Sequence, residues 1–246
     1  MSNTFPKKII ILGGGLDQIF LISTAKKMGL FTLVFDKNPK APGKKIADYF
    51  KPISTRDVNS IKSSIDKFIL EFGKVHGVIT MGSDIPEIVA EIAEYLELPG
   101  LSTQSARWAQ NKYEMKQRFC EFNVNMPRFQ AINELSELSS IFEKLGPKIV
   151  LKPIDQAGSR GVSLAEESKP NVGELFLKAQ AAGNSSLVLA EEFILGPQIS
   201  TEHIYYDGKL YSPGFADRNY EGYENFLPQI IENGGWVPSI HRAKIE

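Results

Sequence analysis

Residues 8–100 alternate between short apolar runs and longer segments with helical periodicity. The runs at residues 8–12 (KIIIL), 31–36 (FTLVFD) and 77–81 (GVITM) have the length and the β-branched composition of buried strands. Between the second and third runs, apolar side chains recur on one helical face at Val58, Ile61, Ile65, Phe68 and Phe72. Strict alternation of strand and helix favours a doubly wound parallel sheet, so we expect a Rossmann-like α/β domain over residues 1–100.

A connection rich in Pro, Gly and Ser at residues 98–105 (LPGLSTQS) separates this domain from a different pattern. Residues 101–190 mix helical segments with short strands. Further on, the Asp-Gly dipeptide at 207–208, which is favoured in tight hairpin turns, lies between two alternating runs. We therefore expect a second, α+β domain over residues 101–246, with a first lobe at 101–190 and the start of a second lobe at 191–246.

The charge and the apolar runs argue against two kinds of partner. The formal net charge is -1 and no block of basic residues is present, so the phosphate attraction on which nucleic-acid binders rely has no source. No apolar run approaches the roughly 18 residues of a membrane-spanning helix, and the N-terminal segment lacks the features of a signal peptide. We expect a cytoplasmic protein that binds neither nucleic acid nor membrane. The one cysteine, Cys120, is expected in the core, and the three histidines are too scattered for a metal site.

The stretch IVLKPIDQAGSRGVSLAEE, residues 149–167, places a lysine before a glycine-containing loop. A P-loop has the opposite order, with its lysine after the glycines at the start of a helix. If the flanking apolar runs are antiparallel strands, residues 155–161 form a mobile flap whose amides can fold over a polyphosphate. Lys152 would then meet a phosphate as a compact point charge. An ordinary surface hairpin with a solvated lysine is the alternative for this stretch taken alone.

Two other stretches have the character of ligand sites. Gly13 to Gly15 follow the first strand and Asp36 ends the second, as in a dinucleotide-binding fold, but the third glycine of that fingerprint is missing. The glycines therefore indicate an NAD-binding enzyme, a turn that only shapes the domain, or a contact with an acceptor substrate. In residues 189–202 (LAEEFILGPQISTE), a strand breaks at a Gly-Pro pair and offers exposed backbone groups beside apolar side chains, which is what a purine ring requires.

The order of three stretches resembles the ATP-grasp superfamily, in particular the carbamoyl-phosphate-synthase-like ligases. These stretches are NKYEMK (111–116), VLKPIDQAGSRGV (150–162) and AEEFILGPQISTE (190–202), and they follow a Rossmann-like domain. The segment VITMGSDIPEIVAEIAEYLELPGLS (78–102) is also similar to that family. The resemblance covers nearly the whole chain. It implies a pre-ATP-grasp domain followed by a two-lobed ATP-grasp domain that holds ATP between its lobes and is truncated before its metal-binding strands.

The resemblance also implies which residues bind the phosphates of ATP. Lys112, in NKYEMK, and Lys152 would contact the phosphates. Gly158, Ser159 and Gly161 would form the flap that closes over them.

The nucleoside of ATP would be held, by the same resemblance, at the stretch that follows. Glu191 and the main chain of Glu192 and Ile194, with Phe193 between them, would hold adenine. Gln198 stands where the family usually binds ribose with a carboxylate, and an amide can still form a hydrogen bond with a hydroxyl group.

The implied chemistry is ATP-dependent ligation. A carboxylate attacks the γ-phosphate of ATP, and an amine or similar nucleophile captures the acyl phosphate, with Mg²⁺ and the lysines stabilising the transferred charge. The family's magnesium ligands, a Glu and a later Glu-x-Asn pair, are expected beyond residue 246. The chain is therefore predicted to be C-terminally incomplete, and the sequence assigns no metal ligand or catalytic residue within it.

The expected partners are ATP and small-molecule carboxylate and amine substrates. Candidate contacts for the acceptor are Gly14, Gly15, Gln18 and Arg218. Because the magnesium ligands are not found in the sequence, a nucleotide-binding or nucleotide-sensing protein without catalysis is one alternative to the ligase. The NAD-binding enzyme is another, and a homodimer is left open.

Overall fold

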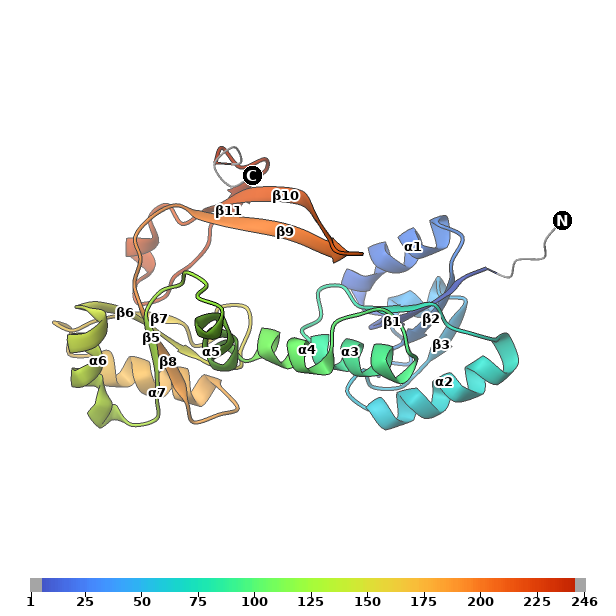
Figure 1. Cartoon of the computed structure of the whole chain (residues 1–246), viewed down its shortest axis with the longest axis horizontal. Coiled ribbons are helices and arrows are strands. Elements are labelled where there is room, and N and C mark those ends of the chain that lie inside the picture. Colours follow the sequence, from blue (N-terminus) through green and yellow to red (C-terminus); the bar gives the residue numbers. More distant parts are fainter. Residues whose placement is uncertain (1–5, 242–246) are drawn as a thin grey trace. The chain divides into compact units, whose positions relative to one another are not determined.

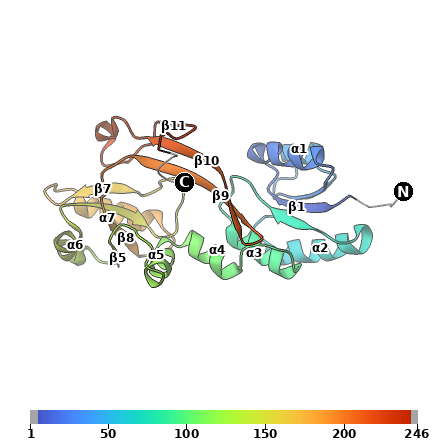
Figure 2. The ribbon, with the colours of Figure 1, turned by 45° about the horizontal axis from the view of Figure 1, so that its top comes forward.

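The computed structural model of the protein describes residues 6–241. Residues 1–5 and 242–246, the outer ends of the two expected domains, lie outside the described residues. The chain forms two compact units. In the ribbons of Figure 1 and Figure 2, the first unit runs from blue to green and the second from green to red.

The first unit ends at Asn111 and the second begins at Lys112. The sequence placed the domain boundary at residue 100, before helix α4 (Thr103–Gln110). In the structure α4 packs on helix α3 (Pro86–Tyr95), so the first compact unit includes α4. The division into domains in the functional sense stays a prediction.

A parallel four-stranded sheet forms the centre of the first unit. In the order β3-β2-β1-β4, its strands are Tyr49–Lys51, Phe31–Phe35, Lys8–Leu12 and Gly77–Ile79. All neighbouring strands are parallel, which confirms the α/β class predicted from the strand–helix alternation. Strand order reverses between β1 and β4, and open sheets of this kind bind ligands beyond the carboxyl ends of the strands at such a point.

Helices cover both faces of this sheet, as a parallel sheet requires. Besides α3, they are α1 (Ile19–Lys27) and α2 (Val58–Phe72). Successive residues of β1 point to opposite faces. Ile10 therefore packs with buried residues of α2 and α3, whereas Ile11 packs with Ile22 of α1.

An antiparallel four-stranded sheet follows in the second unit, after helix α5 (Lys112–Glu121). In the order β5-β8-β6-β7, its strands are Phe129–Ile132, Val188–Glu192, Lys148–Pro153 and Ser163–Glu166. Helices α6 (Leu138–Leu145) and α7 (Val172–Ala182) share one core with alternate strand residues, namely Ile132, Ile149, Leu151, Ala165, Val188 and Ala190. The intervening residues of β6 and β8 therefore point to the opposite face.

A three-stranded antiparallel sheet completes the second unit. In the order β11-β10-β9, its strands are Gly234–Trp236, Lys209–Asn219 and Gln198–Tyr206. Asp207 and Gly208 connect β9 to β10 with φ angles of +49° and +73°, and positive φ at both positions is what a two-residue hairpin turn of type I′ requires. The hairpin predicted at this dipeptide is confirmed.

Cys120 lies on α5 and is exposed, so its prediction as a core residue is wrong. Helix α5 buries Lys116 and none of its other side chains, and its last residues are exposed. The physical reason is that the one side chain that α5 buries is the polar Lys116, so periodicity along this helix does not place Cys120 in a core. Within residues 6–241, no helix is long and apolar enough to cross a membrane.

Phe68 on α2 is the position where truncation is expected to damage the first unit most clearly. The side chain is 1% exposed, and its ring centroid lies 4.7 Å from that of Phe72 and 5.3 Å from that of Tyr49. Phe68→Ala should lower the free energy of unfolding by about 3–5 kcal/mol, because it removes buried surface and leaves a cavity. Urea unfolding followed by circular dichroism measures this loss.

Leu70 on the same helix is a matched control, because its side chain is 89% exposed. Leu70→Ala should change the free energy of unfolding by less than about 0.5 kcal/mol. Equal losses in the two variants would contradict the placement of α2 against the sheet.

Candidate functional site

Two lysines and one glutamate meet on the sheet face opposite to α6 and α7. Lys152 of β6 donates a hydrogen bond from Nζ to Glu191 Oε2 of β8 at 2.7 Å, and the Nζ of Lys116 lies 3.2 Å from Glu191 Oε1. The side chains of Lys116 and Glu191 are 8% and 9% exposed, and that of Lys152 is 20% exposed. The structure thus brings together the predicted residues Lys152 and Glu191, and it adds Lys116.

This cluster has more positive than negative charge, because two ammonium groups share one carboxylate. A largely buried charge without a counter-ion is unfavourable, so the arrangement favours an anion beside the lysines. Within the described residues, Glu191 Oε1 accepts no hydrogen bond, although Lys116 lies within ion-pair distance of it. This oxygen can therefore also accept a hydrogen bond from a ligand donor such as an amino group.

The loop between β6 and β7 has a backbone that depends on glycine. Positive φ angles occur at Gly158 (+62°), Ser159 (+56°) and Gly161 (+72°), and glycine reaches this region without the steric cost of a side chain. A Cβ atom on Gly161 would lie 2.6 Å from the Cβ of Ala182 and 3.2 Å from the Cδ of Pro153. The antiparallel pairing of β6 with β7 agrees with the hairpin expected from the sequence.

The amides of this loop are available to a ligand. Within residues 6–241, the N–H groups of Gly158, Ser159 and Gly161 donate to no backbone acceptor. Unpaired amides that follow one another in such turns form a concave site for anions. Closure of the loop over phosphates stays a prediction.

Lys112 and Asp155 hold the base of the loop. The backbone N–H of Lys112 donates to Ile154 O at 2.8 Å, and its Nζ donates to the carbonyl oxygen of Gln156. The Asp155 carboxylate accepts the N–H of Asn184 at 3.0 and 3.2 Å to its two oxygens. The predicted phosphate ligand Lys112 is therefore part of the loop's own attachment.

One pocket of about 230 Å³ in the second unit gathers residues predicted to bind adenine, ribose and acceptor. These residues are Phe193, Ile194, Gln198 and Arg218. Gln198 and Arg218 lie opposite each other in the register of β9 and β10. The ring centroids of Phe193 and Tyr223, which also lines the pocket, are 6.4 Å apart.

In this pocket, the N–H of Ile194 is available to a ligand and the guanidinium of Arg218 is not. Within residues 6–241, the N–H of Ile194 donates to no backbone acceptor. The guanidinium of Arg218 is already paired with the Glu232 carboxylate, at 3.1 Å from Nε to Oε1 and 2.7 Å from Nη2 to Oε2. Arg218 would have to exchange this partner in order to bind an anionic substrate.

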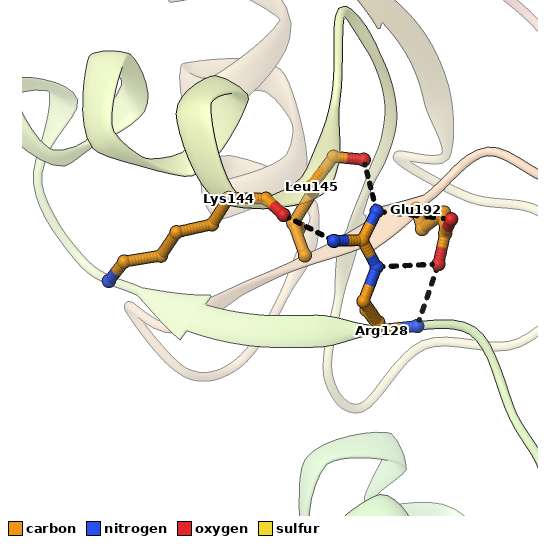
Figure 3. A network of polar contacts seen from close by, with 4 residues as sticks. All are labelled: Arg128, Lys144, Leu145 and Glu192. Atoms are coloured by element: carbon orange, nitrogen blue, oxygen red, sulfur yellow. Dashed lines mark hydrogen bonds and ion pairs between the residues drawn. The ribbon is translucent and has the colours of Figure 1, made fainter.

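The Glu192 side chain points to Arg128 (Figure 3). Arg128 Nε donates to Glu192 Oε2 at 3.0 Å and Nη2 donates to Oε1 at 3.2 Å. The side-chain hydrogen bond from Arg128 holds the pKa of the Glu192 carboxyl below its usual value and raises the pKa of Arg128. The role predicted for Glu192 uses its main chain and not this carboxylate.

Gln18, which was predicted to contact the acceptor substrate, instead forms hydrogen bonds within the first unit. It is 3% exposed, its Nε2 donates to Met81 O, and its Oε1 accepts the Met81 N–H at 3.1 Å. These bonds tie the segment after β1 to the segment after β4. Gln18 would have to give them up to reach a substrate.

The Asp36 carboxylate also forms its hydrogen bonds within the first unit. Asp36 Oδ2 accepts the N–H of Gly14 at 2.7 Å, and Oδ1 accepts the N–H of Asn38 at 2.8 Å. Both carboxylate oxygens are thus used inside the loop, so this geometry does not support the alternative of an NAD ribose at Asp36. Gly15 is open, because a Cβ atom there would meet no atom within 4 Å.

The sequence assigned no metal ligand within the chain. Residues 6–241 contain no group of three or more His, Cys, Asp or Glu side chains that could hold a metal ion. The sequence placed the magnesium ligands beyond residue 246, and that expectation stays untested.

Two residues of the site were missed by the sequence reasoning. Lys116 follows Lys112 by four positions in α5, a spacing that puts two side chains on the same helical face and could have indicated a pair. Arg128 gave no such signal, because it lies 64 positions from Glu192.

Comparisons with known proteins show which proteins the chain resembles. No family model matches the chain. It is 27% identical over 198 residues to a formate-dependent phosphoribosylglycinamide formyltransferase of Prochlorococcus marinus, covering 76% of this chain and 48% of the relative. It is 26% identical over 216 residues to a phosphoribosylamine–glycine ligase of Methanocaldococcus jannaschii, covering 82% and 47%. The chain thus spans about half the length of the curated relatives it matches.

Solved structures share the fold over nearly the whole chain. The N5-carboxyaminoimidazole synthetase of Staphylococcus aureus, solved in complex with ADP, superposes with a TM-score of 0.75 at 16% identity. The superposition covers 98% of this chain and 61% of the synthetase. In sequence and in fold the chain is thus similar to these enzymes, which agrees with the resemblance of its sequence to the ATP-grasp superfamily.

Proposed function

We propose that the chain binds ATP on the sheet face that carries Lys152 and Glu191, as part of an ATP-dependent carboxylate–amine ligase. The observation that carries this proposal is the largely buried cluster in which Lys116 and Lys152 share one carboxylate. The polyphosphate of ATP supplies the anion that this surplus positive charge favours. The amino group of adenine supplies a donor for Glu191 Oε1, which accepts no hydrogen bond within the described residues.

The loop between β6 and β7 is proposed to close over the phosphates. Its unpaired amides at Gly158, Ser159 and Gly161 offer donors that need no side chain. Lys112 would turn its Nζ from the carbonyl oxygen of Gln156 to a phosphate oxygen. A charged donor gains more from an ionised acceptor than from a neutral carbonyl, so the exchange is favourable.

Adenine and ribose are proposed to bind where β8 ends. The N–H of Ile194 donates to no backbone acceptor within residues 6–241, so it can meet an acceptor on the base edge. Phe193 and Tyr223 provide apolar ring surface beside it. The Gln198 amide is the proposed partner of the ribose hydroxyl groups, because it lines the same pocket.

The proposed chemistry transfers the γ-phosphoryl group and then forms a C–N bond. A carboxylate oxygen attacks the γ-phosphorus, the bond to the departing ADP breaks, and an acyl phosphate forms. An amine then attacks the acyl carbon and inorganic phosphate leaves with the bonding electron pair. The lysines and the flap would orient the phosphates and offset their charge.

The acceptor substrate is the less defined half of this proposal. Gly14, Gly15 and Arg218 are the proposed contacts, and Gly15 is the most open of the three. Gln18 is less suited, since its amide is bonded to Met81. A homodimer and a cytoplasmic location stay predictions.

The lysine cluster gives the main test of ATP binding. Lys152→Met and Lys116→Met should each weaken Mg-ATP binding about 10- to 100-fold, because a hydrogen bond to a charged group contributes about 1.5–3 kcal/mol. Isothermal titration calorimetry measures the affinity, and melting without nucleotide shows whether each variant is folded.

Lys67→Met is the control for removal of a lysine. Lys67 is an exposed residue of α2 in the first unit. Its replacement should leave the affinity within about twofold. A wild-type chain that gives no binding signal at millimolar Mg-ATP would contradict the proposal.

Gly161 gives a separate test of the flap. Gly161→Ala should lower the free energy of unfolding by about 1–3 kcal/mol, because alanine is strained at this positive φ and its Cβ would overlap with Ala182. The double variant Gly161→Ala/Ala182→Gly should recover the part caused by the overlap. Denaturant unfolding measures both, and a single variant as stable as the wild type would refute the close packing at the flap base.

The ligase and a nucleotide-binding protein without catalysis differ in their products. The ligase predicts that ADP is released when a carboxylate and an amine are supplied together with Mg-ATP. Release of ADP that depends on both substrates, detected by a coupled assay on this chain, would reject the non-catalytic alternative. The Lys152→Met variant is the control for contaminating ATPase activity.

A further inference from the structure

Arg128 directly precedes β5 and connects it to the end of β8 and to the end of α6. Besides its two side-chain bonds to Glu192, Arg128 Nη1 donates to Lys144 O at 2.6 Å and Nη2 donates to Leu145 O at 3.2 Å, at the end of α6 (Figure 3). Its main chain also takes part, since Arg128 O accepts the Glu192 N–H at 2.9 Å and Arg128 N–H donates to Glu192 Oε2 at 3.3 Å. One residue thus fixes both the backbone and the side chain of Glu192.

The chain after Glu192 has few other attachments. Phe193 N–H donates to Lys148 O at a long 3.3 Å, and β9 begins only at Gln198. Within residues 6–241, the N–H of Ile194 donates to no backbone acceptor. The direction in which the peptide groups of residues 192–194 point therefore depends on how firmly Glu192 is held.

The network contributes more to geometry than to stability. The side chains of Arg128 and Glu192 are 60% and 31% exposed, and an ion pair at such a surface adds little to the free energy of unfolding. A planar guanidinium that binds both oxygens of a carboxylate nevertheless fixes the orientation of its partner. Its remaining donors are fixed by the carbonyl groups at the end of α6.

We propose that Arg128 is a positioning residue for the nucleobase of the ATP proposed above, through the main chain of Glu192 and Ile194. Adenine presents an amino donor beside a ring acceptor, whereas guanine presents a carbonyl acceptor at the position of the amino group. A strand end that offers one C=O and one N–H in a fixed orientation accepts the first pattern and rejects the second. Arg128 therefore acts on the preference for ATP over GTP and leaves phosphate binding to the lysines.

The test compares three ligands by isothermal titration calorimetry on the whole chain: Mg-ATP, Mg-GTP and inorganic tripolyphosphate. Arg128→Gln should weaken ATP binding about tenfold and should leave GTP and tripolyphosphate within about twofold, so that the ATP/GTP preference falls about tenfold. Arg128→Lys keeps the charge without the planar fork and should lose a large part of the preference. Glu192→Gln, which removes the charge from the other side of the pair, should change the preference in the same direction.

Arg107→Gln is the matched control. Arg107 pairs with Glu87 in the first unit, and the two side chains are 59% and 32% exposed, almost as in the Arg128 pair. This variant loses a surface ion pair of the same kind but should keep the wild-type preference. Lys152→Met should weaken all three ligands together, because it acts on the phosphates.

Three outcomes separate this inference from the proposal of ATP binding. An unchanged ATP/GTP preference in folded Arg128→Gln and Arg128→Lys, with ATP bound by the wild type, would overturn the role of Arg128 alone. Equal weakening of all three ligands would overturn it as well, since it would show a structural role only. A wild-type chain that binds none of the ligands would reject ATP binding itself.

Discussion

The sharing of Glu191 by Lys116 and Lys152 is the contact on which the second unit and its proposed ligand both depend. The three residues come from α5, β8 and β6, and they lie on the sheet face that receives no packing from α6 and α7. An ion pair between Lys116 and Glu191 thus joins α5 to the central strand β8. Removing one lysine would leave a neutral pair, whereas removing Glu191 would leave two like charges in a shielded place. The two lysines therefore need the Glu191 carboxylate between them. Because one positive charge still remains in excess, the same arrangement also favours an anionic ligand.

The sequence predicted those parts of the fold that local patterns determine. The strands β1, β2 and β4 were found because each is a short apolar run, and the β9–β10 hairpin was found because Asp207-Gly208 suits positive φ at both positions. Strand β3 (Tyr49–Lys51) was missed, since three half-buried residues at a sheet edge leave no periodic signal. The exposure of Cys120 was also not predicted, because periodicity in α5 does not show that Lys116 is the residue that this helix buries.

Sequence reasoning recovered the site only in part, for a related reason. Lys152 and Glu191 lie in recognisable stretches, but their contact is set by the antiparallel register of β6 and β8, in which Val150 lies opposite Glu191. Lys116 and Arg128 act through tertiary contacts that join distant segments, and a charged residue in a sequence is by default a solvated one. The sequence therefore indicated most residues of the candidate site, but it could not show which charged side chains pair with one another.

The two glycine-rich loops show how internal hydrogen bonding separates a structural turn from a ligand site. In the first unit, the amide of Gly14 is satisfied by Asp36, and Gln18 is bonded to the neighbouring segment. In the second unit, the amides of Gly158 and Gly161 donate to no backbone acceptor within the described residues. Both loops carry the same glycine signal in the sequence. Of these two loops, only the second combines unpaired donors with surplus positive charge at its base, and for this reason phosphate recognition is proposed for the lysine-led loop between β6 and β7 and not for the glycines after β1.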